Sequence, residues 1–479
     1  MAKNATKDMT TGSPMKLILQ FGIPLFFGML FQQFYNMMDT VIVGKFLGVN
    51  ALAAVGATGS INFMVIGFCM GVCNGFAIPV AQQFGAGDYR ALRKYVANSV
   101  WLSIGFAGAM TVAVCALCRQ ILTWMNTPAD IMGGAYNYIF VIFLGIPVIY
   151  LYNLLSGIIR SLGDSKSPLV FLVCSSVLNI VLDLTLILVF HMGVAGAAWA
   201  TVISQGISGV ACLVYMVKRF EILKISREEW RLDGKYAAVL CNMGIPMGLQ
   251  YSITAIGSVI LQTAVNTLGS AAVASTAAAA KIGMFFFCPF DAIGSTMATY
   301  AGQNVGAGKL GRVSQGINST SLLGLVYSVL AFGALALFGP TIALLFVDSS
   351  ETAILQNVSW FLNINSAFFF PLALVNIIRF TIQGLGFSKF AVLAGVCEMG
   401  ARSTVGMGFV PVFGYVAACF ASPVAWVCAD IFLVPAYFYV MKKLRHMLKD
   451  KEHQESLKKK SRLPELGAVP CTESGAIQQ

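Results

Sequence analysis

Apolar residues along this chain gather in about twelve runs of 20 or more residues, and short polar breaks separate the runs. The runs begin near Leu17, Ala51, Tyr95, Tyr136, Leu169 and Val194 in the first half, and near Tyr236, Ala272, Val313, Ile354, Phe390 and Tyr415 in the second. A helix of this length matches the hydrocarbon thickness of a bilayer. Because lipid offers the backbone no hydrogen-bond partners, we expect each run to be a transmembrane helix.

The chain also repeats itself, because short segments of the first half recur in the second at an offset of 221 to 223 residues. The matching pairs are Phe21–Pro24 with Met243–Pro246, Gln82–Gly87 with Gln303–Gly308, Ser161–Lys166 with Gly384–Lys389, and Gly193–Ala200 with Gly414–Ala421. Six spans per repeat is an even number, so both repeats enter the membrane from the same side. The predicted fold is an all-α polytopic membrane protein with twelve transmembrane helices, in two six-helix lobes related by a parallel internal repeat and separated by a cleft.

Charged segments set the predicted domain boundaries. We expect a cytoplasmic N-terminal tail over residues 1–15, an N-lobe over 16–220, a cytoplasmic linker over 221–235, a C-lobe over 236–443, and a disordered cytoplasmic tail over 444–479. The first sixteen residues are polar, and the apolar run after them is too long for the core of a cleavable signal. We therefore expect the first run to remain as a membrane span.

Composition restricts the class of protein. Apolar residues make up 57% of the chain and charged residues 11%, against about 45–50% and 25% in average soluble proteins. So few charges cannot cover a soluble surface, which excludes a soluble enzyme, a secreted scaffold and a nucleic-acid-binding protein. With the N-terminus inside, 26 of the 31 Lys and Arg residues fall in inside segments and two in outside loops. The net charge of +11 therefore reflects topology, and it predicts a multi-pass protein of the cytoplasmic membrane with both termini in the cytoplasm.

The sequence contains no motif of a metal, nucleotide or catalytic site. The 12 cysteines lie almost all within apolar runs, and neither a histidine nor a second cysteine pair completes a zinc set. The glycine-rich segments Gly85–Gly87 and Gly306–Gly308 lack the lysine and the preceding strand of a phosphate-binding loop. We therefore expect no metal, no cofactor, no nucleic-acid partner and no enzymatic activity. Two lobes about a cleft are the architecture of alternating access, and without a nucleotide site the energy for transport must come from an ion gradient or from the transported solute itself.

Polar stripes mark three helices of the first lobe. Each stripe has the spacing of one helix face: Gln32, Asn36 and Asp39 in the first span, Ser175, Asn179 and Asp183 in the fifth, and Thr201, Ser204, Gln205 and Ser208 in the sixth. In lipid such stripes must face one another or water. One interpretation is inter-helix hydrogen bonding worth about 1 kcal/mol per bond, and the other is a cation or proton site. The two aspartates favour the site, because close and poorly solvated carboxylates cannot easily both ionise.

The second lobe does not repeat this stripe. Under the repeat offset, the positions of Asp39, Asn179 and Asp183 correspond to Leu261, Arg402 and Gly406. Glu398 and Arg402 are four residues apart on one helix, in the favourable order for a structural salt bridge. Asp291 and Asp430 lack such a partner and are predicted to line the cleft, and Arg379 is expected to reach the membrane interface.

Prolines lie at equivalent places in the two lobes. Pro24 in the first span and Pro246 in the seventh each remove one helix hydrogen bond. A kink there is an inexpensive hinge, although many prolines of membrane helices only shape packing. We predict a hinge at Pro24, because its helix carries Asp39.

Several motifs resemble those of the multidrug and toxic compound extrusion (MATE) family over about residues 13–443. The motifs are Asp39–Gly44, Gln82–Gly87 with its repeat Gln303–Gly308, Arg160–Asp164, Asn179–Asp183 and Gly196–Thr201. The resemblance implies a twelve-helix, two-lobe exporter driven by inward H⁺ or Na⁺. It is similar to the DinF-like bacterial branch, which implies cation or proton coupling at Asp39, Asn179, Asp183 and Thr201 and a bend at Pro24. The coupling glutamate of the NorM-like branch falls on Thr254, which argues against that branch.

The expected function is a secondary antiporter that exports amphipathic, cationic organic compounds such as drugs and toxins. The predicted substrate cleft contains Gln32, Asn36, Ser175, Gln205, Asp291 and Asp430. Carboxylates between Phe and Met walls favour cations, and oxygen ligands suit Na⁺ as well as a proton, which leaves the coupling ion open. We expect a monomer in the lipid bilayer. The alternative is a flippase for a lipid-linked precursor, which needs a cationic cleft; a membrane enzyme and a passive channel fit the pattern less well.

Overall fold

A computed structural model describes residues 6–344 and 348–460, and every regular element in these ranges is helical. The first half contains α1 (Pro14–Leu47), α2 (Val49–Ala57), α3 (Gly59–Ala86), α4 (Tyr89–Trp124), α5 (Met132–Leu144), α6 (Ile146–Ser161), α7 (Lys166–Leu184), the π-helical turn η1 (Thr185–Val189), α8 (Gly193–Arg219) and the 3₁₀ turn η2 (Glu221–Leu223). The second half contains α9 (Gly234–Asn266), α10 (Ser270–Gly306), α11 (Leu310–Ala343), α12 (Thr352–Ala367), α13 (Phe369–Gly384), α14 (Ser388–Thr404), the π-helical turn η3 (Val405–Phe409), α15 (Val410–Phe413) and α16 (Tyr415–Lys460).

These helices account for twelve membrane spans. Among the described residues, 9 helices are long and apolar enough to cross a bilayer, and the bent pairs α5–α6 and α12–α13 bring the number to 11. The pairs bend by 47° and 51° at short breaks, as broken spans do. The remaining span is α14–η3–α15, whose apolar run is weakened by Glu398 and Arg402 and interrupted by a π-helical turn. The predicted all-helical fold with twelve spans is confirmed.

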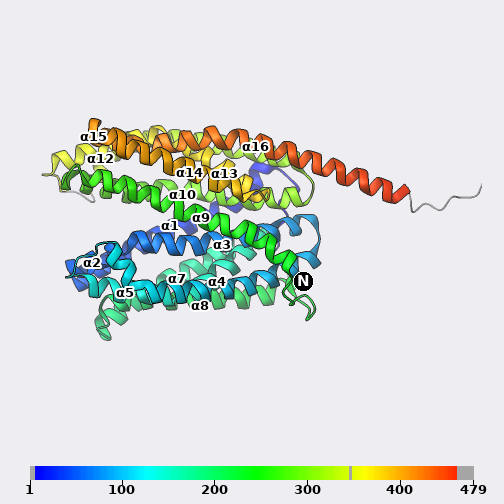
Figure 1. Ribbon diagram of the computed structural model, residues 1–479, viewed down its shortest axis with the longest axis horizontal. Coiled ribbons are helices and arrows are strands. Elements are labelled where there is room, and N and C mark those ends of the chain that lie inside the picture. The colour runs from blue at the N-terminus through cyan, green and yellow to red at the C-terminus, as the bar shows by residue number, and fades with distance from the viewer. Residues whose placement is uncertain (1–5, 345–347, 461–479) are drawn as a thin grey trace, which may run out of the picture. The chain divides into compact units, whose positions relative to one another are not determined.

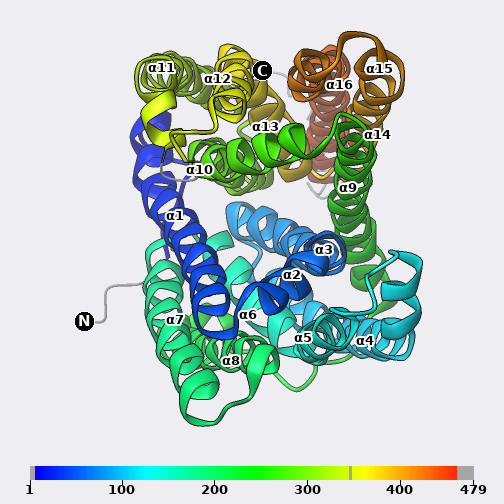
Figure 2. The ribbon, with the colours of Figure 1, turned by 90° about the vertical axis from the view of Figure 1, so that its left-hand side faces the viewer.

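The two halves form two lobes, and the first helix of each half contacts both of them. Figure 1 shows α3 to α8 on one side of the bundle and α10 to α15 on the other. Helix α1 contacts α7 of its own lobe and also α10 and α11 of the second. Helix α9 contacts α14 of its own lobe and also α3 and α4 of the first. Figure 2 shows α1 and α9 on opposite sides of the space between the lobes, so a movement of either helix affects both lobes.

Reciprocal hydrogen bonds join the lobes near the linker. The side-chain amide of Gln82 on α3 donates to the carbonyl of Gly384 over 2.9 Å. Its repeat equivalent, Gln303 on α10, donates to the carbonyl of Ser161 over the same distance. Ser161 and Gly384 are themselves equivalent in the repeat, so the two bonds are related by the internal symmetry.

Glycines allow the helices to approach closely at this point. A Cβ atom at Gly85 would collide with the backbone of Gln303, and one at Gly306 would collide with the backbone of Gln82. Small residues permit such contacts between membrane helices, where van der Waals packing drives association. The two Gln–Gly motifs are therefore the contact surfaces of α3 and α10, which explains why they recur in both lobes.

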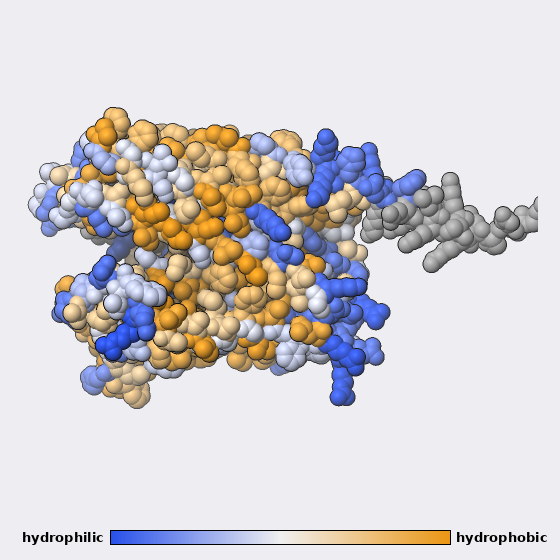
Figure 3. Space-filling view, viewed as in Figure 1, coloured by the Kyte–Doolittle hydropathy of each residue, from blue (hydrophilic) through white to orange (hydrophobic). Residues whose placement is uncertain are grey.

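The surface fits a bilayer environment. On the face drawn in Figure 3, apolar side chains form a broad band and hydrophilic ones gather at the helix ends. Ile104, Val112, Ile207 and Val329 are more than half exposed, as expected for side chains that contact lipid. The molecule is therefore a multi-pass membrane protein.

The helix ends lie close to the predicted domain boundaries. Helix α8 ends at Arg219 and α9 begins at Gly234, and the residues between them form the connection that was predicted as a linker. Helix α16 continues to Lys460, into the segment predicted as a disordered tail, and residues 461–479 lie outside the described residues. The boundaries of the lobes themselves stay predictions.

Candidate functional site

A pair of carboxylates lies inside the first lobe. Asp39 is near the C-terminal end of α1, and Asp183 is in the last turn of α7, directly before the π-helical turn η1. Their exposed fractions are 9% and 0%, and the two carboxyl groups are close enough to interact electrostatically. Within the described residues, both oxygens of Asp183 and one of Asp39 have no hydrogen-bond partner. Because ionised carboxylates only accept hydrogen bonds, a bond between these two requires a proton.

Neutral polar groups surround the pair. The Tyr35 hydroxyl lies 3.0 Å from the Thr201 hydroxyl, and the Asn179 amide donates to the same Thr201 oxygen over 3.4 Å. The side-chain carbonyl oxygen of Asn179 is buried and has no partner among the described residues. Tyr138 of α5 is close enough to Asp39 for the two side chains to interact electrostatically. Among the residues that the structure describes, the site therefore offers oxygens and no basic partner for the carboxylates.

The four predicted coupling residues converge in this site. Asp39 comes from α1, Asn179 and Asp183 from α7, and Thr201 from α8, and these helices contact one another. No Lys, Arg or His side chain in the described part of the chain forms a salt bridge with either aspartate. The sequence analysis missed Tyr35, which lies one helical turn before Asp39 on the same face and was detectable from that spacing.

A cavity of about 90 Å³ lies beside the carboxylate pair. Three residues predicted for the substrate cleft, Gln32, Ser175 and Gln205, line it together with Asn179. The Ser175 hydroxyl donates to the Ser204 carbonyl over 2.9 Å, whereas the Gln205 carbonyl oxygen has no partner within the described residues. The cavity is too small for an amphipathic drug, so it does not by itself form the predicted substrate cleft.

The second lobe contains a cluster of paired charges. Glu398 on α14 accepts a hydrogen bond from Arg379 on α13, and Arg402 lies 3.7 Å from its other carboxylate oxygen. The predicted pair of Glu398 and Arg402 is therefore only the weaker half of the contact. The expectation that Arg379 reaches the interface is wrong, because its exposed fraction is 6%. Packing of α13 against α14 brings this arginine to Glu398, and a spacing rule within one helix cannot find that contact.

The other residues predicted to line the substrate cleft do not lie together. Asp291 on α10 is exposed, and Asp430 on α16 is partly buried with one unpartnered oxygen among the described residues. Both lack a partner in register on their own helix, as predicted from the sequence, but both interact electrostatically with Arg379 of α13. Asn36 on α1 is exposed and does not line the cavity of the first lobe. The six predicted cleft residues thus divide between the two lobes.

Metal coordination receives no support from side-chain clusters. In the described ranges, no group of three or more His, Cys, Asp or Glu side chains is arranged to hold a metal ion. Cys69, Cys73 and Cys212 are buried free thiols and form no disulfide. The absence of a metal and of a cofactor stays a prediction.

The fold and the buried carboxylates define a two-lobe, twelve-helix membrane transporter. The sequence model of the MatE family matches residues 24–185 and 246–407, one match in each lobe and 222 residues apart. The chain therefore belongs to the MATE family, and the two matches confirm the parallel repeat.

Individual relatives agree with this assignment. The probable multidrug resistance protein YpnP of Bacillus subtilis is 30% identical over 384 residues, which cover 79% of this chain and 83% of the relative. The crystal structure of MATE in complex with MaL6 matches with a TM-score of 0.86 at 22% identity, over 93% of this chain and 100% of that one. An outward-facing multidrug resistance MATE transporter matches with a TM-score of 0.85 at 22% identity, over 91% and 98% of the two chains. At these identities the solved structures show the shared fold.

Proposed function

We propose that this protein is a secondary antiporter that exports amphipathic organic compounds, mainly cations, across the cytoplasmic membrane while H⁺ or Na⁺ enters. The observation that carries the proposal is the buried pair of Asp39 and Asp183, which face each other without a basic partner among the described residues. The name of the relative YpnP, a probable multidrug resistance protein, supports the export of drug-like compounds.

Repulsion between the two carboxylates supplies the chemistry of coupling. Two ionised carboxylates repel strongly in a medium of low dielectric constant, and a bound proton or cation removes that repulsion. Asp39 is on α1 and Asp183 is on α7, so occupancy of the site changes the force between these helices. Because α1 also contacts α10 and α11, its displacement reaches the second lobe. Pro24, whose ring removes one hydrogen bond of α1, gives the helix a bend point.

The donor set suits either coupling ion. Carboxylate, amide and hydroxyl oxygens are the ligands of hard cations, and Asp39, Asp183, Asn179 and Thr201 provide all three types. The same carboxylates can share one proton without further ligands. The proposal therefore includes H⁺ and Na⁺, and transport measurements decide between them.

Charge and topology complete the proposal. The exposed carboxylate of Asp291 favours a cationic group in the space between the lobes. The distribution of Lys and Arg supports a cytoplasmic location for both termini. One chain contains both lobes, which supports transport by a monomer. The comparisons give no support to the alternative of a flippase.

Purified protein in sealed vesicles tests the function. The vesicles are loaded with rhodamine 123, a fluorescent cation, and a proton gradient and a sodium gradient are imposed separately. We expect one gradient to accelerate dye movement relative to protein-free vesicles, and expect that acceleration to disappear when the gradient is collapsed by an ionophore. Dye movement that ignores both gradients contradicts the antiporter.

A matched pair of variants tests the site. Asp183→Asn removes one buried charge while preserving the shape of the side chain, and Asp130→Asn makes the same change at an exposed position. We expect only Asp183→Asn to abolish the response to the gradient. Equal behaviour of the two variants rules out the carboxylate pair as the coupling site.

A further inference from the structure

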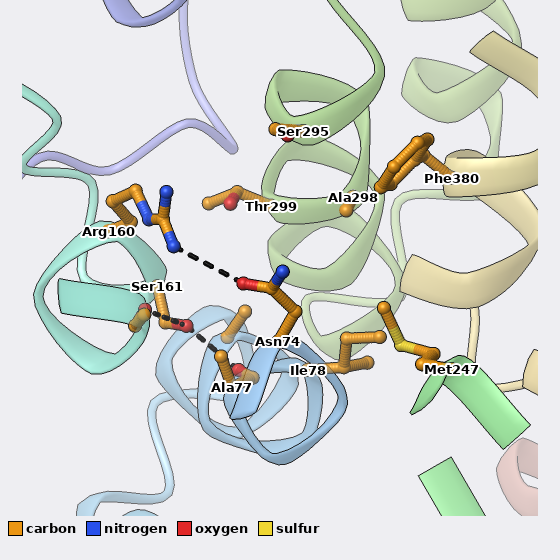
Figure 4. A pocket seen from close by; sticks show the side chains of 12 residues that line it. Asn74, Ala77, Ile78, Arg160, Ser161, Met247, Ser295, Ala298, Thr299 and Phe380 are labelled. Atoms are coloured by element: carbon orange, nitrogen blue, oxygen red, sulfur yellow. Dashed lines mark hydrogen bonds between the residues drawn. The ribbon is translucent and has the colours of Figure 1, made fainter. Parts of the chain in front are cut away.

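A second polar pocket, separate from the carboxylate pair, lies between the lobes. Figure 4 shows Arg160, near the end of α6, pointing into a small cavity with Asn74 of α3 on one side and Ser295 and Thr299 of α10 on the other. The volume of the cavity is about 50 Å³. Residues from both lobes line it, so it is part of the surface that rearranges when the lobes move.

The charge of Arg160 is not neutralised in the described part of the chain. No carboxylate lies within salt-bridge distance, and its one hydrogen bond goes to the neutral side-chain oxygen of Asn74 over 3.2 Å. A guanidinium has five N–H donors, so most of its donors remain available. The charge count assigns Arg160 to an inside segment, but its side chain is partly buried between helices at the end of α6. A buried arginine without a paired charge is costly and marks a candidate functional position. Its repeat equivalent in the second lobe is the neutral Gln383, so the common fold does not require this charge.

Further donors converge on the same cavity. The hydroxyls of Ser295 and Thr299 form no hydrogen bond within the described residues, and the NH₂ group of Asn74 is likewise not engaged. A guanidinium, an amide and two hydroxyls together form an environment for a negatively charged group. A cavity of this size holds a few water-sized atoms, which corresponds to one carboxylate or phosphate oxygen cluster and not to a complete drug molecule.

A carboxylate lies further along the same helix face. Asp291, Ser295 and Thr299 are spaced four residues apart on α10, so they share one face. At 1.5 Å per residue, Asp291 is displaced along the axis by about 6 Å from Ser295 and about 12 Å from Thr299. Asp291 is exposed. The space between the lobes thus presents a positive pocket and, one to two helical turns away, an exposed carboxylate that also interacts electrostatically with Arg379.

We propose that the Arg160 pocket binds an anionic group of the transported solute, while the cationic group of the same solute lies toward Asp291. The substrate class includes zwitterions whose opposite charges are separated by about one to two helical turns. This inference rests on the proposed function, because it assumes that organic solutes enter the space between the lobes. It adds a binding site and a specificity that the carboxylate pair of the first lobe does not provide.

Two dyes with one scaffold test the pocket. Rhodamine 110 carries a free carboxylate and is a zwitterion, whereas rhodamine 123 is its methyl ester and is a cation. Vesicle transport and fluorescence anisotropy with detergent-solubilised protein are measured for both dyes. We expect Arg160→Gln to lower the ratio of acid to ester, in transport and in binding affinity, by about tenfold, the change for one lost charged hydrogen bond. Ser295→Ala and Thr299→Ala should lower it by about twofold to threefold.

Controls separate charge from folding. Arg160→Lys keeps the positive charge and should retain part of the preference for the acid. Arg119→Gln removes an exposed arginine and should leave the ratio unchanged. Thermal unfolding of each detergent-solubilised variant identifies loss of structure, in which case Arg160→Lys and the two hydroxyl variants carry the test. An unchanged ratio in correctly folded Arg160→Gln overturns the proposal.

The source of the anionic group is tested separately. Replacement of chloride by gluconate should leave the acid-to-ester ratio of the wild type unchanged. If chloride removal instead alters transport of the ester, and Arg160→Gln abolishes that effect, the pocket holds chloride and the proposal is overturned. If the wild type transports neither dye, the proposed exporter fails, whereas the anisotropy ratio still supports or rejects the anionic pocket.

Discussion

The two lobes have the same arrangement of helices, but they differ in how their buried acidic side chains are paired. In the first lobe, Asp39 and Asp183 face each other among neutral hydroxyls and amides. In the second, Glu398 is neutralised by Arg379 and approached by Arg402. A buried acid with an arginine partner stays charged and holds helices together, whereas two facing acids must exchange a proton or a cation. The comparison shows that the internal repeat determines the helices and that single substitutions within it determine whether a buried acid has an arginine partner.

Symmetry is retained where the lobes touch and lost inside them. Gln82 and Gln303 form equivalent hydrogen bonds, and Gly85 and Gly306 form equivalent backbone contacts. Close packing restricts the residues at this interface in both lobes, whereas the polar residues inside each lobe have diverged, so the carboxylate pair occurs in only one of them.

The largest expected effect is on gradient-driven transport, and it compares substitutions in the carboxylate pair of the first lobe with a substitution in the charged cluster of the second. Asp39→Asn or Asp183→Asn should reduce gradient-driven dye transport by about 100-fold, the upper range of coupling between linked sites. Asp430→Asn in the second lobe should reduce it by less than about fivefold, because Arg379 is retained near that position. Transport by vesicles of known protein content measures both effects. Equal losses from the two lobes contradict functional asymmetry.

The next effect concerns stability of the second lobe. Glu398→Gln leaves Arg379 and Arg402 buried without a carboxylate partner at that point, and it should lower the free energy of unfolding by about 3–5 kcal/mol. Replacing both members of the strong pair, as Glu398→Gln with Arg379→Met, should recover much of the loss. Denaturant unfolding in detergent measures each step. A stable Glu398→Gln variant that has lost transport places Glu398 in the functional set.

The first lobe was largely predictable because its residues follow helical periodicity. Asp39, Asn179, Asp183 and Thr201 occur on three polar stripes, and stripes on neighbouring membrane helices must face each other. The apolar runs and the repeat offset likewise predicted the spans, because bilayer thickness fixes their length.

The second lobe was less predictable because its contacts connect different helices. Arg379 reaches Glu398 only through the rotation of α13 against α14, which no spacing along the sequence encodes. The division of the predicted cleft residues has the same cause. Gln32 lines the cavity of its own lobe, whereas Asn36, one turn later on the same face of α1, is exposed. Spacing along one helix does not show which part of a face its neighbours cover.

A smaller effect is expected at the equivalent prolines. Pro24→Ala restores one backbone hydrogen bond to α1 and removes its bend point, so dye binding should persist while gradient-driven transport slows by about fivefold to tenfold. Pro246→Ala should slow transport by about twofold, because α9 carries no coupling carboxylate. Binding and transport are measured on the same purified variant. Equal losses in both quantities, or in neither, reject a hinge at Pro24.

The smallest expected effect concerns the contacts at the N-terminal ends of two corresponding helices, α4 in the first lobe and α11 in the second. Arg93 near the start of α4 donates two hydrogen bonds, of 2.8 and 2.9 Å, to Glu229 of the linker. At the start of α11, Arg312 donates to the carbonyl of Gly12, and Lys309 donates to the carbonyl of Thr10. A carboxylate titrates and a backbone carbonyl does not. Acid should therefore weaken the anchor in the first lobe and spare the one in the second.

The sign and the pH range follow from Glu229. Its hydrogen bonds with Arg93 lower the pKa of this carboxyl from 4.5 to about 2. The stabilisation is present above pH 4.5, the pKa of this carboxyl in the unfolded chain. It is lost as the pH falls from 4.5 toward about 2, the pKa in the folded protein. Glu229→Gln should cost about 1–2 kcal/mol at neutral pH, and the difference from wild type should shrink below pH 4.5 in thermal unfolding of the detergent-solubilised protein. Glu221→Gln is the matched control, because its exposed contact with Lys224 at 3.8 Å should contribute less than about 0.5 kcal/mol. If the wild type and Glu229→Gln differ by a constant amount down to acid pH, the carboxylate is not the anchor, and the two lobes are held alike.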